Sequence, residues 1–294
     1  MERVLASRPL WCVAARAVWV PLLVFSLGFN LLEGLEHYVV EHCRLGNHLD
    51  VAGRFADAIP QYQEALRINR DYVEAHSSYG NVLRQVGRLP EAIAECRRAL
   101  RLDPNYARAH NNLANALLDT GKIEEAIEHY HEALRLRPGD AKMHFNLGNA
   151  WLATGREAEA IQEYQTALRL NPDDEEAHYN LGNVFLKDGR NEEAIAQYTI
   201  AVQIKPEYVE ARNNLGSALL DAGRTEQAIA QLEAAVRSRP NYAPAYNNLG
   251  AAFVRAGRPR EAIAEFAAAL RIKPDFVEAR QNLERTLARL LGTK

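Results

Sequence analysis

Two series of asparagines at fixed spacing are the residues of this sequence whose types and positions are best suited to chemistry. Side chains three residues apart lie on one face of a helix, and an asparagine amide offers two hydrogen-bond donors and an acceptor. Amides repeated along one face could therefore hold the backbone of an extended peptide, whatever its sequence. The first series is Asn112, Asn146, Asn180, Asn214, Asn248 and Asn282, and the second series is Asn47, Asn81, Asn115, Asn149 and Asn183.

Both asparagine series need an explanation, because asparagine is unfavourable inside a helix. Peptide binding is the first interpretation. The alternative, which the sequence leaves open, is that the amides join neighbouring helices or simply follow from duplication of a repeat.

Five histidines recur at the repeat spacing, and histidine is a common metal ligand, but this spacing argues against a metal site. Packed helices lie ~8–10 Å apart, whereas two ligands of one zinc ion, each about 2 Å from the metal, nearly touch. We therefore predict that these side chains pack between helices and bind no metal. The residues are His42, His76, His110, His144 and His178.

Composition and motifs narrow the function classes further. The net charge is −3 and 25% of the residues are charged, so no basic excess indicates nucleic-acid binding. The cysteines, Cys12, Cys43 and Cys96, lack the paired spacing of a disulfide framework or a zinc site. No nucleophile elbow, P-loop, dinucleotide-binding or zinc-protease motif is present. We expect no catalytic residues, no cofactor and no enzymatic activity from this chain alone.

A unit of 34 residues positions all of these side chains. In the copy at 175–208, apolar residues at helical spacing predict a first helix over about 175–188, and Gly189 suits its left-handed end. A second helix is expected from near Glu192 to Pro206, with Gly182 small where the two helices approach closely. One hairpin cannot bury its apolar stripe alone, so each copy must stack on its neighbours.

The unit resembles the tetratricopeptide repeat (TPR) family, which shares its period, a Leu-Gly pair such as Leu181-Gly182, an alanine and an aromatic residue in the second helix, and a late proline. Cys96 and Leu232 depart from the pattern by replacing that aromatic residue. The resemblance implies an all-α fold, a right-handed α-solenoid with a concave groove. Seven repeats are expected, at 39–72, 73–106, 107–140, 141–174, 175–208, 209–242 and 243–276, followed by a capping helix over 277–294.

The N-terminal segment 1–38 does not fit the repeat, and we expect a hydrophobic helix there. Residues 17–32 carry no charge, and Arg16 is the only charged residue in the apolar stretch 10–32. A single-pass membrane anchor is the first interpretation, with the N-terminus in the cytoplasm and the repeats on the opposite side, because basic residues precede the stretch. A cleaved signal peptide, or a helix that caps the first repeat of a cytoplasmic protein, are the alternatives.

Numbering each repeat from 1 to 34 relates its side chains to the family. The asparagines at position 6 are similar to the ladder in the TPR arm of O-linked N-acetylglucosamine transferase, which holds extended peptides. The carboxylate clamp of chaperone-binding TPR domains is absent, because position 5 lacks its lysine. Aromatic residues at position 34 are expected to wedge repeat against repeat, and they are Tyr72, Tyr106, Tyr208, Tyr242 and Phe276.

The sequence thus predicts a membrane-tethered, non-enzymatic scaffold for protein interactions, which holds an extended peptide segment of a partner protein in its concave groove. A substrate-recruiting subunit of a glycosyltransferase system is one alternative. The other is a homo-oligomer that assembles through its own repeats.

Overall fold

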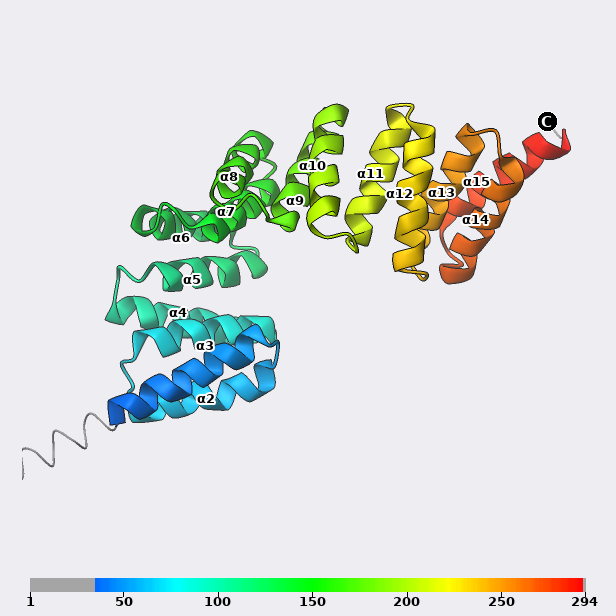
Figure 1. Ribbon diagram of the computed structural model, residues 1–294. Coiled ribbons are helices and arrows are strands. Elements are labelled where there is room, and N and C mark those ends of the chain that lie inside the picture. Colours follow the sequence, from blue (N-terminus) through cyan, green and yellow to red (C-terminus); the bar gives the residue numbers. More distant parts are fainter. Residues whose placement is uncertain (1–34, 293–294) are drawn as a thin grey trace, which may run out of the picture. The chain divides into compact units, whose positions relative to one another are not determined.

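The computed structural model describes residues 35–292, and within them it consists of helices joined by short turns (Figure 1). These residues contain no strand, and each helix packs against its neighbour along the chain as a hairpin. The structure therefore confirms the expected all-α solenoid of helical hairpins with a final capping helix. The hydrophobic helix expected before the repeats falls almost wholly outside the described residues.

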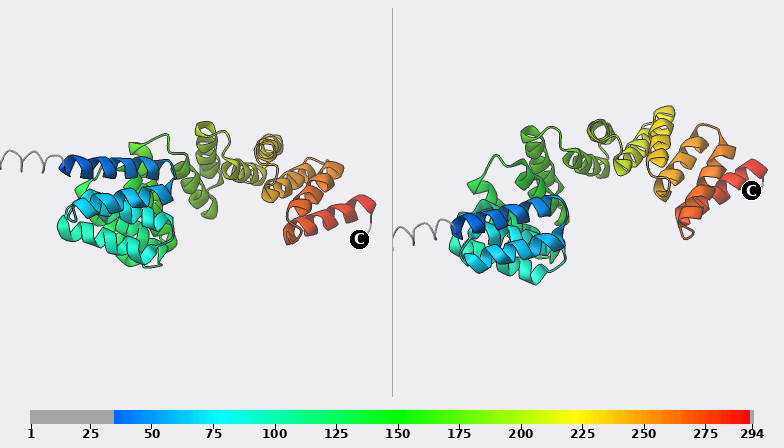
Figure 2. Two further views of the ribbon diagram at one scale, coloured as in Figure 1. Left: turned by 90° about the horizontal axis from the view of Figure 1, so that it is seen from below. Right: turned by 60° about the horizontal axis from the view of Figure 1, so that its bottom comes forward.

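The chain divides into two compact units, 1–138 and 139–294, and each is a stack of hairpins (Figure 2). The described part of the first unit contains the helical residues 35–51, α2 (Phe55–Ile68), α3 (Val73–Gln85), α4 (Leu89–Leu102), α5 (Ala107–Asp119) and α6 (Ile123–Leu136). The second contains α7 (Ala141–Ala153), α8 (Glu157–Leu170), α9 (Glu175–Lys187), α10 (Asn191–Ile204), α11 (Val209–Asp221), α12 (Thr225–Ser238), α13 (Ala243–Arg255), α14 (Pro259–Ile272) and α15 (Val277–Leu291).

Small residues let the two helices of a hairpin approach closely. In the hairpin of α9 and α10, a Cβ atom on Gly182 would lie only 2.7 Å from Cε1 of Tyr198, a ring that is fully buried. The turn that follows α9 contains Gly189 at φ 73°, a left-handed conformation that costs glycine little. Glycine is therefore required for two different reasons within one repeat.

An arginine precedes most of the second helices, at a position where a serine or aspartate would be more usual. Arg190 precedes α10, and its Nε donates to Glu193 Oε2 at 2.6 Å in the first turn of that helix. Its guanidinium carbon also lies 4.2 Å from the centroid of the Phe185 ring in α9. The arginine therefore ties the end of the first helix to the start of the second. Arg156 and Arg258 make the same two contacts in their own repeats.

The histidine series lies between successive repeats, as its spacing predicts. His178 Nε2 lies 3.0 Å from the carbonyl oxygen of Pro172 in the preceding repeat, and its Nδ1 lies 2.7 Å from Gln197 Oε1 in α10. Arg212 takes the same place one repeat later and donates to Pro206 O and Gln231 Oε1, both at 2.7 Å. No cluster of three or more potential metal ligands occurs in residues 35–292.

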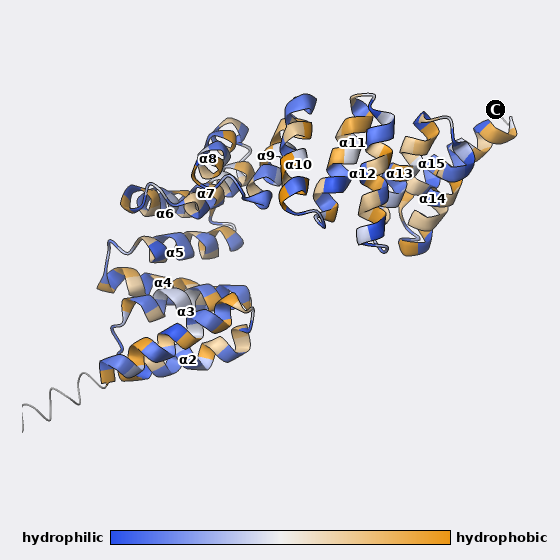
Figure 3. Ribbon diagram, in the orientation of Figure 1, coloured by the Kyte–Doolittle hydropathy of each residue, from blue (hydrophilic) through white to orange (hydrophobic). Residues whose placement is uncertain are grey.

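The expected membrane-spanning architecture is wrong as a description of this fold. Within residues 35–292 no helix is long and apolar enough to cross a membrane, because polar and apolar residues alternate around each helix (Figure 3). The stretch 10–32, on which that expectation depended, lies outside the described residues.

Candidate functional site

Within each unit, the first helices of neighbouring repeats lie on the same side of the stack. Within each unit, first helices contact each other directly, as α3 does with α5, α11 with α13, and α13 with α15, whereas no pair of second helices in the described residues makes comparable contact. Helices that approach more closely on one side of a stack lie on its inner, concave side. Both asparagine series are carried by these first helices.

The second asparagine series closes each hairpin through a tyrosine hydroxyl. Tyr198, in α10, donates its hydroxyl to Asn183 Oδ1 in α9 at 2.7 Å. Burial raises the pKa of Tyr198, so the hydroxyl remains a donor. Asn81 differs because Cys96 replaces its tyrosine, and its Nδ2 donates to Asp50 at 3.0 Å instead. The same tyrosine contact is made to Asn47, Asn115 and Asn149.

The first asparagine series joins each repeat to the one before it. Asn180 Nδ2 donates to Asn149 Oδ1 at 3.1 Å, and Asn214 Nδ2 donates to Asn183 Oδ1 at 3.0 Å. In the first unit, Asn112 donates to the backbone oxygen of Ser77 at 3.1 Å. Asn146 is half-buried in α7.

Position 5 supplies acceptors that the sequence reasoning did not assign. Asn213 and Asn247 are buried, and they accept hydrogen bonds from Asn248 and Asn282 respectively, each at 2.9 Å. The only signal for this in the sequence was a second asparagine directly before the one at position 6. The amides of the second unit thus form chains that run from repeat to repeat.

These contacts use only part of the hydrogen-bonding capacity of Asn180 and Asn183, whereas Asn112 and Asn214 already use both their amide nitrogen and their amide oxygen. Asn180 uses its Nδ2 toward Asn149, which leaves its Oδ1 as an acceptor, and Asn183 uses its Oδ1 twice, which leaves its Nδ2 as a donor. Both side chains are half-buried. An amide can therefore join two repeats and still offer an acceptor or a donor to a bound chain.

The two cysteines within residues 35–292 do not contribute a reactive group to this face. Cys43 and Cys96 are buried, and burial raises the pKa of each thiol to about 12. Thiols with such a pKa are poor nucleophiles at neutral pH.

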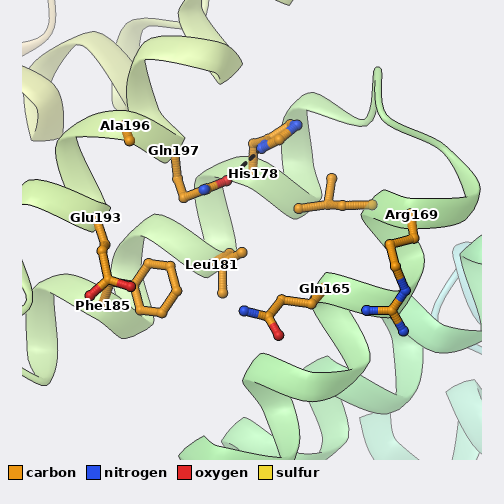
Figure 4. Close-up of a pocket in the computed structure, with 9 residues that line it drawn as sticks. Gln165, Arg169, His178, Leu181, Phe185, Glu193, Ala196 and Gln197 are labelled. Atoms are coloured by element: carbon orange, nitrogen blue, oxygen red, sulfur yellow. Dashed lines mark hydrogen bonds between the residues drawn. The ribbon is translucent and has the colours of Figure 1, made fainter.

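Two cavities lie in the second unit near the junction between α8 and α9. One, of about 450 Å³, opens between α8, α9 and α10, where His178, Leu181 and Phe185 line it (Figure 4). It contains no member of either asparagine series. The other, of about 460 Å³, lies between the beginnings of α7 and α9, next to Phe145 and Lys142. Sequence reasoning missed both cavities.

The fold and the repeated side chains define a class of protein, an α-solenoid built from stacked helical hairpins. A family model described as tetratricopeptide repeat matches residues 43–107, 111–175 and 213–275, which is more than half of the chain. Models described as TPR repeat and tetratricopeptide repeat match residues 182–223 and 163–196. This chain belongs to the tetratricopeptide repeat family.

Solved structures support the same fold. The chain is similar to YrrB, described as a TPR protein with an unusual peptide-binding site, at 26% identity and a TM-score of 0.57, over 63% of this chain and 96% of that one. The PilF protein of Pseudomonas aeruginosa is 21% identical with a TM-score of 0.65, over 72% of this chain and 96% of that one. At that identity the likeness shows the fold alone. A comparison with curated proteins found no match.

Proposed function

We propose that the face formed by the first helices holds an extended segment of a protein partner through its backbone. The observation that carries the proposal is the half-used amides, such as Asn180 with its free Oδ1 and Asn183 with its free Nδ2. A peptide backbone carries one donor and one acceptor on almost every residue, so it matches such a face without regard to side chains. The similarity to YrrB, a TPR protein described by its peptide-binding site, supports the same function.

The spacing of the amides fits an extended chain. Packed helices recur ~8–10 Å apart, and an extended peptide advances ~3.3 Å per residue. One amide of the first series would therefore serve about three peptide residues. Because backbone groups carry no side-chain identity, sequence preference along this part of the face should be weak.

The test is a fluorescence-polarisation titration of unstructured, polar peptides of about fifteen residues. Each hydrogen bond contributes ~0.5–1.5 kcal/mol net, so Asn180→Ala should weaken binding by up to about tenfold. The triple variant Asn146→Ala, Asn180→Ala, Asn214→Ala should lose more. Gln203→Ala is the matched control, because Gln203 is an exposed amide on the second helix α10.

Stability must be measured beside affinity, because the same amides join the repeats. Circular dichroism and thermal unfolding will show whether each variant keeps its fold. If the folded triple variant binds the peptides as tightly as the parent, the amides serve only as joints between repeats and the proposal is wrong.

A further inference from the structure

Position 34 carries an aromatic residue in most repeats, and in the second unit the reason is visible. Tyr208 packs its ring against Tyr179 at position 5, with 5.0 Å between the centroids. Lys205, three residues earlier, places its Nζ 5.3 Å from the centroid of the Tyr208 ring. The same cation–ring contact occurs at the ends of the next two repeats, between Arg239 and Tyr242 and between Lys273 and Phe276. A cation and an aromatic ring therefore fill the space between two first helices.

The repeat that ends at residue 174 lacks both members of this pair. Asn171 stands in place of the cation and Asp174 in place of the ring. The Asp174 carboxylate accepts hydrogen bonds from the backbone N–H groups of Glu176 and Ala177, at 3.1 and 2.9 Å, and so caps its own helix. It cannot fill the space that Tyr208 fills one repeat later.

The cavity of about 460 Å³ between the beginnings of α7 and α9 lies at this position. Its lining includes Phe145, the position-5 counterpart of Tyr179, as well as Lys142, Asn171, Asp174 and Glu176. Phe145 packs against Tyr164 with 5.8 Å between the ring centroids. Tyr164 is fully buried, whereas Phe145 is only half-buried.

We propose that this cavity receives an aromatic side chain of the bound peptide, which takes the place of the missing position-34 ring. The inference rests on the proposed peptide-binding function, because Phe145 directly precedes Asn146 of the first asparagine series. A guest ring would pack on Phe145 as Tyr208 packs on Tyr179. Lys142 is close enough to line the same cavity, so it would supply the cation that Lys205 supplies in the next repeat.

Apolar surface and shape, rather than charge, favour an aromatic guest, because the cavity lining carries three carboxylates and one lysine. Asp140 and Asp174 each cap a helix by accepting two backbone N–H groups on Oδ1. Lys142 and Glu176 carry opposite charges on the two sides of the cavity. A tyrosine or phenylalanine would bury apolar surface against Phe145 and leave these charges in place.

The experiment compares guest residues in one polar host peptide, labelled with fluorescein, on the full chain. Tyrosine or phenylalanine at the guest position should bind roughly tenfold tighter than alanine. Asp174→Tyr restores the residue type found in other repeats and should close the cavity. That variant should lose the preference for an aromatic guest and still bind the alanine host as the parent does. Asp173→Tyr, one residue earlier and outside the cavity lining, is the matched control and should keep the preference.

The outcomes separate this inference from the function on which it rests. If the host peptide binds but tyrosine and alanine guests bind equally, or an arginine guest binds best, the aromatic subsite is wrong and the backbone-binding face stands. If no peptide binds, N-acetyl-tyrosinamide is used alone at millimolar concentration. If NMR then shows shifts of the Phe145 ring resonances in the parent but not in folded Asp174→Tyr, the aromatic subsite is supported independently of the asparagine series. No shifts would overturn it.

Discussion

Replacing Asn183 by alanine tests how far the repeats depend on their amides. Asn183 Oδ1 accepts from the buried Tyr198 hydroxyl at 2.7 Å and from Asn214 Nδ2 at 3.0 Å. Alanine removes both bonds and leaves the Tyr198 hydroxyl, which is fully buried, without its acceptor. The same change should therefore affect a contact within the hairpin and a contact between repeats.

The magnitude follows from these contacts. An unsatisfied buried hydroxyl costs ~1–3 kcal/mol, and a lost hydrogen bond ~0.5–1.5 kcal/mol. The better helix propensity of alanine offsets roughly 0.5 kcal/mol of this loss in the free energy of unfolding. Asn183→Ala should therefore destabilise the fold by about 2 kcal/mol. Tyr198→Phe should cost about 1 kcal/mol, because Asn183 keeps its bond from Asn214.

A double-mutant cycle in urea unfolding measures the coupling between the two residues. The double variant should cost about 2 kcal/mol rather than the sum of the single effects, because phenylalanine leaves no hydroxyl to satisfy. Ser217→Ala is the matched control: Ser217 occupies the same position in α11, where Leu232 replaces the tyrosine. If Asn183→Ala lowers the free energy of unfolding no more than this control does, or if the two single effects simply add, the hydrogen bonds of Asn183 do not stabilise the fold.

Three further outcomes are expected. Gly182→Val should destabilise by about 1–3 kcal/mol, measured by urea unfolding, because a Cβ there meets the Tyr198 ring; an unchanged midpoint would contradict the packing. Iodoacetamide at pH 8 should leave Cys43 and Cys96 unmodified until the protein unfolds, and early labelling of either would show that it is exposed. Burial raises the pKa of both thiols to about 12, above their value in the unfolded chain, so their contribution to stability is complete below about pH 8.5 and is lost as the pH rises toward 12; an unfolding series from pH 8 to 11 measures that loss, and a constant midpoint would refute it.

Much of the helical framework could be predicted from the sequence, because local rules determine it. The first helix expected over 175–188 is α9, Glu175–Lys187, and the second, expected from near Glu192, begins at Asn191. Periodic apolar residues and a glycine at a left-handed turn depend only on near neighbours in the chain. That is why a single copy of the repeat was enough to predict its hairpin.

The contacts of the candidate site were less accessible from sequence. The asparagine positions stood out, but the direction of each amide depends on partners 15 or 31 residues away, such as Tyr198 for Asn183 and Asn149 for Asn180. The cavity beside Phe145 lies where position 34 carries Asp174 instead of an aromatic ring, and the absence of a residue type leaves no repeated pattern in the sequence. The expectation of a membrane span depended only on the apolar composition of residues 10–32 and not on a repeated pattern of packing residues.

The contact at position 4 shows that different side chains can join successive repeats in the same way. His178 and Arg212 differ in size and in basicity, yet both reach the carbonyl oxygen of a proline in the preceding repeat and a glutamine in the following helix. Arg280 reaches the equivalent oxygen of Pro274 in the last helix, at 2.8 Å. Histidine and arginine can therefore make the same contact with the preceding proline, although Tyr246 occupies this position in the repeat 243–276. Mutational drift between histidine and arginine is therefore open at this joint, whereas a leucine of similar bulk would leave the proline carbonyl without its donor.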